Sequence, residues 1–336
     1  MNPMRIFLAA LCCALLLFTG CKPSKSSKIA YITNGVDPFW NTAAAGVKAA
    51  AKEFNVDAEV HMPAKGIADQ KRIVESLLAG GVAGIAISPI DAKNQVGLID
   101  EACAVTRVIT HDSDAPDSKR LCFVGMNNYK AGRAAGKLVK EAIPKGGKVM
   151  LFVGRLEQLN AQQRRQGIID ELLDRPEQSL GQTKIDPPGQ PLTGPLYTVL
   201  DTRTDNFDYS RAQANAEDAI TSTPDLACMV GLFAYNPPMC LQALKSAKKN
   251  GQIKLVAFDE QDATLQGILD GDIHGTVSQQ PYYYGYESVR ILAGLARGDQ
   301  SVLPKNGFLE VPIVQVRKDN VEKFWAELKK LQAGGN

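Results

Sequence analysis

Residues 28–40 have the sequence KIAYITNGVDPFW, and this stretch decides the fold class. Its first part, Lys28 to Thr33, is rich in β-branched and aromatic side chains and predicts a strand. After a short loop, apolar side chains recur at the spacing of one helix face, at Trp40, Ala43, Ala44, Val47, Ala51 and Phe54. A strand followed directly by an amphipathic helix is the repeating unit of an α/β protein.

The same alternation continues along the chain in two halves. In the first half we expect strands at 57–61, 83–88, 107–111 and 121–124, and helices around 73–78 and 92–104. In the second half we expect strands at 148–153, 196–200, 226–231, 253–258 and 273–278, and helices around 129–142, 162–173, 209–222, 239–249 and 265–269. Continuous apolar strands between helices are typical of parallel sheets covered on both faces. The sequence therefore predicts an α/β fold with two doubly wound parallel-sheet lobes.

Two segments interrupt this pattern. Arg175 to Pro195 contains five prolines and three glycines, so we expect an unusually long loop there. Gly294 to Gly307 is a similar but shorter break. A last strand near Glu310 to Val316 and a terminal helix around 321–331 follow it.

The N-terminus has the features of an export signal. Arg5 precedes an apolar run over residues 6–18, which is too short to span a bilayer permanently. Cys21, preceded by glycine and followed by the polar tether 22–27, resembles the lipobox cysteine of bacterial lipoproteins. This resemblance implies a signal peptide of residues 1–21 and a lipid anchor on Cys21 at the periplasmic or outer face of a bacterial membrane. Simple cleavage nearby, with release of a soluble protein, is the alternative.

Composition excludes several classes of protein. A chain of 336 residues exceeds one ordinary domain, and its formal net charge of +2 lacks the concentrated basic surface of a nucleic-acid-binding protein. No stretch after the signal is long and apolar enough for a transmembrane helix. Four cysteines remain in the mature chain beyond Cys21. Two interpretations stay open. Cys103 could pair with Cys122 and Cys228 with Cys240 in local disulfides, or all four could be small buried thiols.

Side chains that suit a sugar follow the predicted strands. Open parallel sheets bind ligands beyond the carboxyl ends of their strands, so these loops form the candidate site. Aromatic rings can pack on the C–H faces of a pyranose, while carboxylates, amides and an arginine fork can bind its hydroxyls. The candidate ligand-binding residues in these loops are Asp37, Phe39, Trp40, Asp112, Asp114, Arg164, Phe207, Asn236, Asp259 and Gln279.

In this order, these residues resemble the motifs of the ribose/galactose-type periplasmic sugar-binding proteins of ABC importers. The similarity covers Lys28 to about Val316. It implies the type I periplasmic-binding-protein fold, in which a three-strand hinge joins two lobes. It also implies the roles of single residues: Phe39 and Trp40 stack on the sugar, Phe207 stacks on its opposite face, Asp112, Arg164, Asn236 and Asp259 bind hydroxyls, and Gln279 lies by the hinge.

The resemblance implies lobes of 28–126 plus 280–309 and of 127–279 plus 310–332. The function it implies is that of a monomeric lipoprotein that captures a monosaccharide or cyclitol between the lobes and delivers it to an ABC permease. Ser113 and Asp114 follow Asp112 where the ribose binder has arginine, and this departure leaves the particular sugar open.

The sequence is also compatible with a sensing role. The same lobes could serve a chemoreceptor or sensor kinase, and the sequence does not separate sensing from transport. An exported α/β enzyme would need a nucleophile elbow such as G-x-S-x-G, which is absent from the sequence. The three histidines lack metal-ligand spacing, so neither a metal nor a cofactor is expected. Asp37 could instead cap its helix, and Phe39 and Trp40 could be ordinary core.

Overall fold

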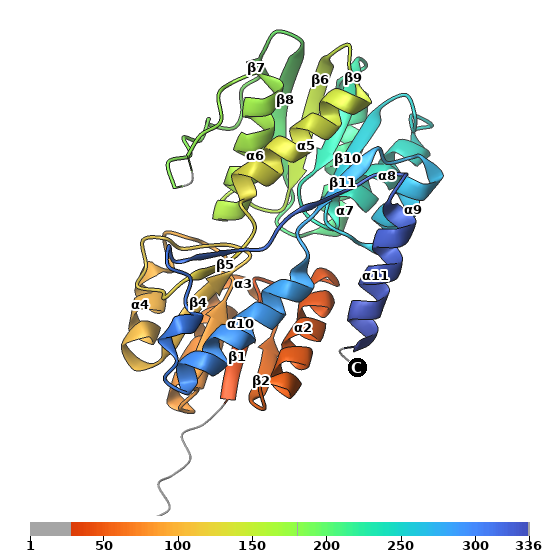
Figure 1. The fold of residues 1–336 in the computed structure, drawn as a ribbon. Helices are drawn as coiled ribbons and strands as arrows, with labels where there is room; N and C mark the ends of the chain where they lie inside the picture. The colour runs from red at the N-terminus through yellow and green to blue at the C-terminus, as the bar shows by residue number, and fades with distance from the viewer. Residues whose placement is uncertain (1–27, 180, 335–336) are drawn as a thin grey trace, which may run out of the picture.

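The computed structural model describes residues 28–179 and 181–334, which form two α/β lobes (Figure 1). The signal peptide and tether predicted for residues 1–27 lie outside the described residues. One lobe is built on a six-stranded sheet and the other on a seven-stranded sheet. The two sheets confirm the predicted α/β class.

The first lobe has an all-parallel sheet in the order β12-β5-β4-β3-β1-β2. Helices α2 and α10 pack on one face of this sheet, and α3 and α4 pack on the other. The bounds of these elements are β1 (Lys28–Ile32), α2 (Phe39–Glu53), β2 (Asp57–His61), α3 (Gly66–Ala79), β3 (Gly84–Ile87), α4 (Val96–Val105), β4 (Arg107–His111), β5 (Phe123–Gly125), α10 (Pro281–Ala296), η1 (Gln300–Val302) and β12 (Phe308–Glu310).

The second lobe has a sheet in the order β13-β11-β10-β9-β6-β8-β7, in which only the edge strands β13 and β7 run antiparallel to their neighbours. Helices α5 and α6 contribute to the core on one face, while α7, α8, α9 and α11 contribute to the core on the other. The bounds are α5 (Asn128–Ala142), β6 (Gly147–Val153), α6 (Leu159–Leu172), β7 (Leu192–Thr193), β8 (Tyr197–Thr204), α7 (Tyr209–Ser222), β9 (Leu226–Gly231), α8 (Asn236–Ser246), β10 (Lys254–Phe258), α9 (Asp262–Asp270), β11 (Gly275–Ser278), β13 (Val314–Val316) and α11 (Val321–Gly334).

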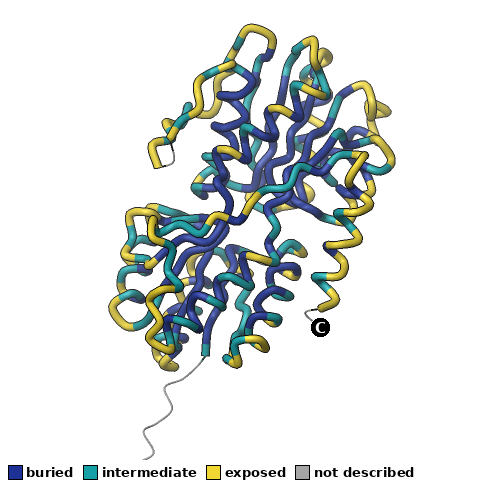
Figure 2. Tube along the Cα trace, viewed as in Figure 1, coloured by how far each residue is buried: buried dark blue, intermediate teal, exposed yellow. Residues whose placement is uncertain are grey.

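The chain crosses between the lobes three times, from β5 to α5, from β11 to α10 and from β12 to β13 (Figure 1). Figure 2 shows that the strands of both sheets are buried, while the loops at the outer ends are exposed. The loops at the inner ends of the two sheets face one another across the crossings (Figure 1).

Two predictions about elements need correction. Residues 281–296 form helix α10, which the sequence analysis did not predict. The single strand expected near Glu310 to Val316 is two short strands that join different sheets, because the chain changes lobe between them. The long segment Arg175 to Pro195 is a loop as expected, apart from the two-residue strand β7.

The four cysteines of the described residues are free thiols, three of them buried and Cys103 half-buried. The disulfide reading is therefore wrong and the thiol reading holds.

Among residues 28–179 and 181–334, no helix combines the length and hydropathy needed to cross a membrane.

Candidate functional site

The cleft between the lobes is lined by polar and aromatic side chains from both of them. The first lobe contributes Asn34, Asp37, Phe39, Trp40 and Asp112. The second lobe contributes Asn160, Arg164, Phe207, Phe233, Ala234, Tyr235, Asp259 and Gln279. We call this set the interlobe cleft. Eight of the ten predicted ligand-binding residues lie in it.

Asp112 connects the two lobes. It follows β4 with φ of 59°, in the left-handed region that Asp and Asn tolerate better than most residues. Its Oδ2 accepts hydrogen bonds from Asn34 at 3.2 Å, from Ser88 at 3.0 Å and, across the cleft, from Asn160 at 3.2 Å. Its Oδ1 lies 3.7 Å from the Arg164 guanidinium. Burial raises the pKa of Asp112, while Arg164 opposes that shift.

Arg164 forms the polar floor of the second lobe's half of the cleft. Its guanidinium is 1% exposed and donates to Asn128 Oδ1 at 2.9 Å, to the Leu232 carbonyl at 3.0 Å and to Gln279 Oε1 at 2.8 Å. The rings of Phe233 and Phe258 lie 5.5 and 5.2 Å from it, within cation–π range. Three of its five N–H groups are therefore already engaged within the protein.

Asp259 repeats in the second lobe the geometry of Asp112 in the first. It follows β10 with φ of 69° and accepts a 2.6 Å hydrogen bond from Gln279 Nε2. Burial is the main cause that raises the pKa of Asp259 well above its usual value. Two buried aspartates at matching strand ends thus face the cleft from opposite lobes.

Aromatic rings form the walls of the cleft. On the first lobe, Phe39 and Trp40 meet edge to face with ring centroids 4.8 Å apart. On the second lobe, Phe207 stacks on Phe233 at 5.7 Å. The Trp40 ring also packs against Tyr31 and His111, so it belongs to both the core and the cleft. The two readings of Trp40 as core and as pocket wall are compatible.

Asp37 has two structural roles. Its Oδ1 accepts from the backbone N–H of Phe39 at 2.8 Å, at the start of α2, which agrees with the capping reading. Its Oδ2 accepts from the Tyr209 hydroxyl at 2.7 Å, and Gln261 Nε2 lies 3.4 Å from Oδ1; both partners belong to the second lobe. Burial raises the pKa of Asp37.

Two predicted residues lie outside the lining of the cleft. Asp114 pairs with Arg120 at 2.6 Å, and it also accepts from Thr110, within the first lobe. Asn236 lies one layer behind the cleft, where its amide donates to Asp205 Oδ2 at 2.9 Å and accepts from the N–H of Phe233. It supports the Phe233 segment instead of facing the cleft.

Five cleft residues were not predicted as ligand contacts: Asn34, Asn160, Phe233, Ala234 and Tyr235. Asn34 and the three residues 233–235 lie in the loops after β1 and β9, whereas Asn160 is the second residue of α6, which follows β6 after a short loop. Their place beyond the strand ends is the same signal that points to Asp112. No group of three or more His, Cys, Asp or Glu side chains in the described residues is placed to hold a metal ion.

Two parallel-sheet lobes with a polar and aromatic cleft between them define a two-lobed ligand-binding protein of type I architecture. The family model of the periplasmic binding protein domain matches residues 29–300, and the chain therefore belongs to this family. The predicted resemblance is confirmed.

Individual relatives agree with this assignment. A D-ribose/D-allose-binding protein of Pseudomonas aeruginosa is 26% identical over 82% of this chain and 83% of its own length. A ribose import binding protein of Bacillus subtilis is 25% identical over 81% of this chain and 87% of its own length. Among solved structures, an ABC transporter solute-binding protein of Burkholderia graminis in complex with D-arabinose superposes with a TM-score of 0.77 at 26% identity, covering 87% of this chain and 96% of its own.

Proposed function

We propose that this chain is an exported solute-binding protein that captures an uncharged monosaccharide or cyclitol between its lobes and delivers it to an ABC importer. The observation that carries the proposal is the pair of aspartates, Asp112 and Asp259, held at matching strand ends on opposite lobes around Arg164. A ring with hydroxyls on opposite edges could bind both aspartates at once. The names of the similar proteins support a sugar as the ligand.

The charge balance of the cleft favours an uncharged ligand. Three carboxylates line it, Asp37, Asp112 and Asp259, against the single guanidinium of Arg164. Arg164 already donates three hydrogen bonds within the protein. A ligand carboxylate or phosphate would therefore add a negative charge to a cleft in which carboxyl groups already outnumber the one guanidinium, whereas sugar hydroxyls can donate to these groups. We infer that sugar acids are discriminated against.

A thermal-shift screen tests the proposal. The panel contains D-ribose, D-allose, D-apiose, D-arabinose, a deoxy sugar, an inositol, and D-glucose paired with D-glucuronate. A ligand that binds only the folded protein raises its melting temperature by mass action. We expect at least one neutral sugar or cyclitol to stabilise the protein and no sugar acid to exceed its neutral counterpart. Stabilisation by sugar acids alone would contradict the proposed charge selection, and a flat response to the whole panel would contradict sugar binding.

We propose that the protein binds its ligand without catalysing a reaction. We also propose that it acts as a monomer, since the two lobes of one chain line the whole cleft. The lipid anchor at Cys21 is part of the proposal, supported by the sequence alone. Cys21→Ser should move the protein from the membrane fraction to the soluble exported fraction. Detergent-phase partitioning like that of the wild type would contradict lipidation.

A further inference from the structure

The start of helix α2 touches the opposite lobe through two separate arms. The first arm is the Asp37 carboxylate, which accepts from Tyr209 at 2.7 Å and lies 3.4 Å from Gln261 Nε2. The second arm is Thr42, whose hydroxyl accepts a 2.9 Å hydrogen bond from Gln332 in the terminal helix. We call these two arms the α2 latch. The partners in each arm belong to different lobes, so an opening that moves α2 away from α7 and α11 breaks both arms.

Tyr209 is held in position for this contact. Its ring stacks on the Tyr235 ring of the cleft wall with centroids 4.8 Å apart and planes 7° from parallel. The Tyr235 hydroxyl is in turn bonded to the buried Asp205. The Tyr209 ring itself is 41% exposed and is not part of the cleft lining. The cleft wall therefore presents this hydroxyl to Asp37 from outside the lining of the cleft.

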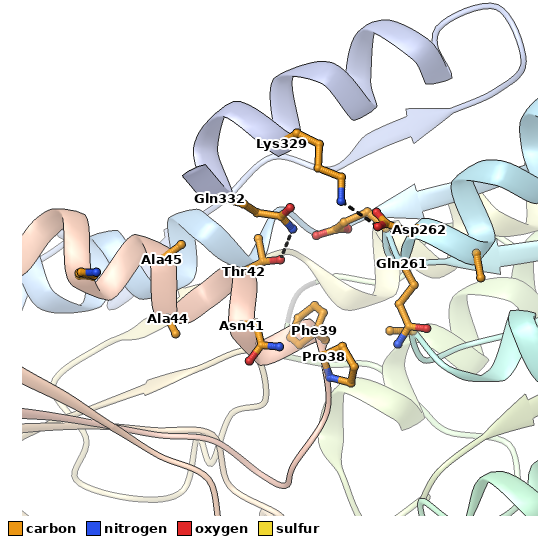
Figure 3. A pocket seen from close by; sticks show the side chains of 14 residues that line it. Pro38, Phe39, Asn41, Thr42, Ala44, Ala45, Gln261, Asp262, Lys329 and Gln332 are labelled. Carbon is orange, nitrogen blue, oxygen red and sulfur yellow. Dashed lines mark hydrogen bonds and ion pairs between the residues drawn. The ribbon is translucent and has the colours of Figure 1, made fainter. Parts of the chain in front are cut away.

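The terminal helix α11 carries the second arm. It follows strand β13 of the second lobe and is fixed there by Asp262, which accepts from Trp325 Nε1 at 2.9 Å and pairs with Lys329 at 2.7 Å. From that anchor it packs along α2 of the first lobe. Figure 3 shows both contacts, Lys329 reaching Asp262 on one side of a groove of about 660 Å³ and Gln332 reaching Thr42 on the other.

We propose that the α2 latch sets how long a captured ligand is retained, with Tyr209 as a positioning residue that never contacts the ligand. The Asp37–Tyr209 bond is charge-assisted, the stronger kind of hydrogen bond. Both side chains have a second contact within their own lobe, Asp37 with the N–H of Phe39 and Tyr209 with the Tyr235 ring. Its energy adds to that of the ligand contacts in the closed form only. Loss of the hydroxyl should therefore speed dissociation and leave the approach of the ligand to the open cleft unchanged.

Tyr209→Phe is the decisive variant, because it keeps the ring that stacks on Tyr235 and removes only the hydroxyl. Tyr286→Phe is its matched control: that hydroxyl also bonds a carboxylate, Glu53 Oε2 at 2.8 Å, but both residues belong to the first lobe. For the neutral sugar with the largest thermal shift, we expect Tyr209→Phe to raise the dissociation rate about tenfold with an association rate within about twofold of the wild type. Tyr286→Phe should change neither rate.

The latch can also be tested without any sugar. X-ray scattering of the ligand-free proteins should give a larger radius of gyration for Tyr209→Phe than for the wild type, and no change for Tyr286→Phe. Equal radii together with equal dissociation rates would overturn the latch. This inference rests on the proposed function only for the rate measurement. Failure of every sugar to bind the wild type would contradict the proposed function. In that case the scattering comparison alone would test the latch.

The second arm is tested by a double-mutant cycle. Thr42→Val and Gln332→Ala each break the same interlobe hydrogen bond, so their effects on the dissociation rate should not add. By contrast, Gln332→Ala and Tyr209→Phe act on different arms, so their effects on the dissociation rate should multiply. Full multiplication of the Thr42 and Gln332 effects would show that the two side chains do not act through one bond, and would overturn the role of α11.

Discussion

At the scale of single residues, the site depends on aspartates in an unusual backbone conformation. Asp112 and Asp259 both have positive φ, which aims each carboxylate from the end of its strand into the cleft. Such conformations cost about 1–3 kcal/mol each and persist where the surrounding structure enforces them. Alanine would change both the charge and the backbone strain at these positions, so asparagine, which tolerates the same region, is the better test.

We predict that Asp112→Asn weakens binding of the neutral sugar at least tenfold while the melting temperature of the ligand-free protein stays near that of the wild type. The physical reason is the loss of a charged acceptor for a buried hydroxyl, worth about 1.5–3 kcal/mol. Isothermal titration measures the affinity. Asp114→Asn is the control, because Asp114 pairs with Arg120 outside the cleft lining. An equal loss of affinity in both variants would mean that the cleft is wrongly defined.

Glu260 predicts a dependence of stability on pH. It is 7% exposed, and neither of its carboxylate oxygens has a hydrogen-bond partner among the described residues. Burial is the main cause that raises the pKa of Glu260 well above its usual value, and the charge of the neighbouring Asp259 raises this pKa further. Ser278 and Arg164 act in the opposite direction. The folded state therefore holds this proton at a pH where the unfolded state has released it. The resulting stabilisation is complete at acid pH and is lost as pH rises through the folded-state pKa.

We expect Glu260→Gln to be more stable than the wild type at pH 9, by about 1 kcal/mol or more, and to show a flatter change of unfolding free energy between pH 5 and pH 9. Urea denaturation at several pH values measures this. Glu101→Gln, at an exposed position of α4, is the control and should follow the wild-type curve. Parallel curves for Glu260→Gln and the wild type would contradict the raised pKa.

Sequence reasoning found the residues whose position follows from a strand end and missed those whose role depends on a distant partner. Asp112, Arg164 and Asp259 follow or face strand ends, which topology alone brings together. The Asp37–Tyr209 bond joins residues 172 positions apart, and only the closed lobes bring them into contact. Asp114 has the right residue type in the right loop, but Arg120 holds it away from the cleft.

At the scale of elements, glycines let helix pairs approach closely in both lobes. A Cβ on Gly46 of α2 would lie 1.9 Å from the Tyr282 carbonyl of α10, and one on Gly132 of α5 would lie 2.1 Å from the Arg164 carbonyl of α6. The second contact fixes the backbone that carries the cleft arginine. The packing of α5 on α6 thus decides where the guanidinium lies.

Gly132→Ala should therefore lower both stability and sugar affinity. Overpacking of this kind costs about 1–3 kcal/mol, and the required shift of α6 would displace Arg164 from Gln279 and Asn128. Gly97→Ala in α4 is the control, since a Cβ there meets nothing within 4 Å. Its free energy of unfolding should rise by about 0.5–1 kcal/mol. Denaturant unfolding and titration with the same sugar measure the two effects. A Gly132→Ala protein with wild-type affinity would show that α6 does not depend on this contact.

Helix α10 was not predicted because its local sequence is a poor guide. Its first half, PYYYGY, combines three consecutive tyrosines with a glycine, residues of low helix propensity. The helix forms because α2 supplies a packing surface and because Pro281 starts it at a lobe crossing. The Tyr284 hydroxyl, which accepts from the N–H of Met126 and donates to Gln279, ties this helix to two of the three crossings.

At the scale of the whole molecule, the three crossings allow the lobes to open and close as rigid bodies. Only two tryptophans can report this motion. Trp40 is 3% exposed at the cleft wall, whereas Trp325 is bonded to Asp262 within the second lobe and moves with it.

We predict that sugar binding changes the intrinsic tryptophan fluorescence, that Trp40→Phe abolishes the change and that Trp325→Phe retains it. The reason is that the second lobe closes over the Trp40 ring and alters its solvent exposure. A ligand-induced signal that survives in Trp40→Phe and vanishes in Trp325→Phe would mean that the terminal helix, and not the cleft wall, senses closure.

The order of the strands along the chain also delays completion of the first lobe. The five parallel strands of the second sheet, and the helices between them, come from one continuous stretch up to residue 278, whereas the first sheet lacks its edge strand β12 and its covering helix α10 until residues 281–310 are available. A chain emerging N-terminus first cannot complete its first lobe until nearly all of it has appeared. For a chain proposed to be exported, this late completion would keep the leading segment from forming a finished domain while the rest is still in transit.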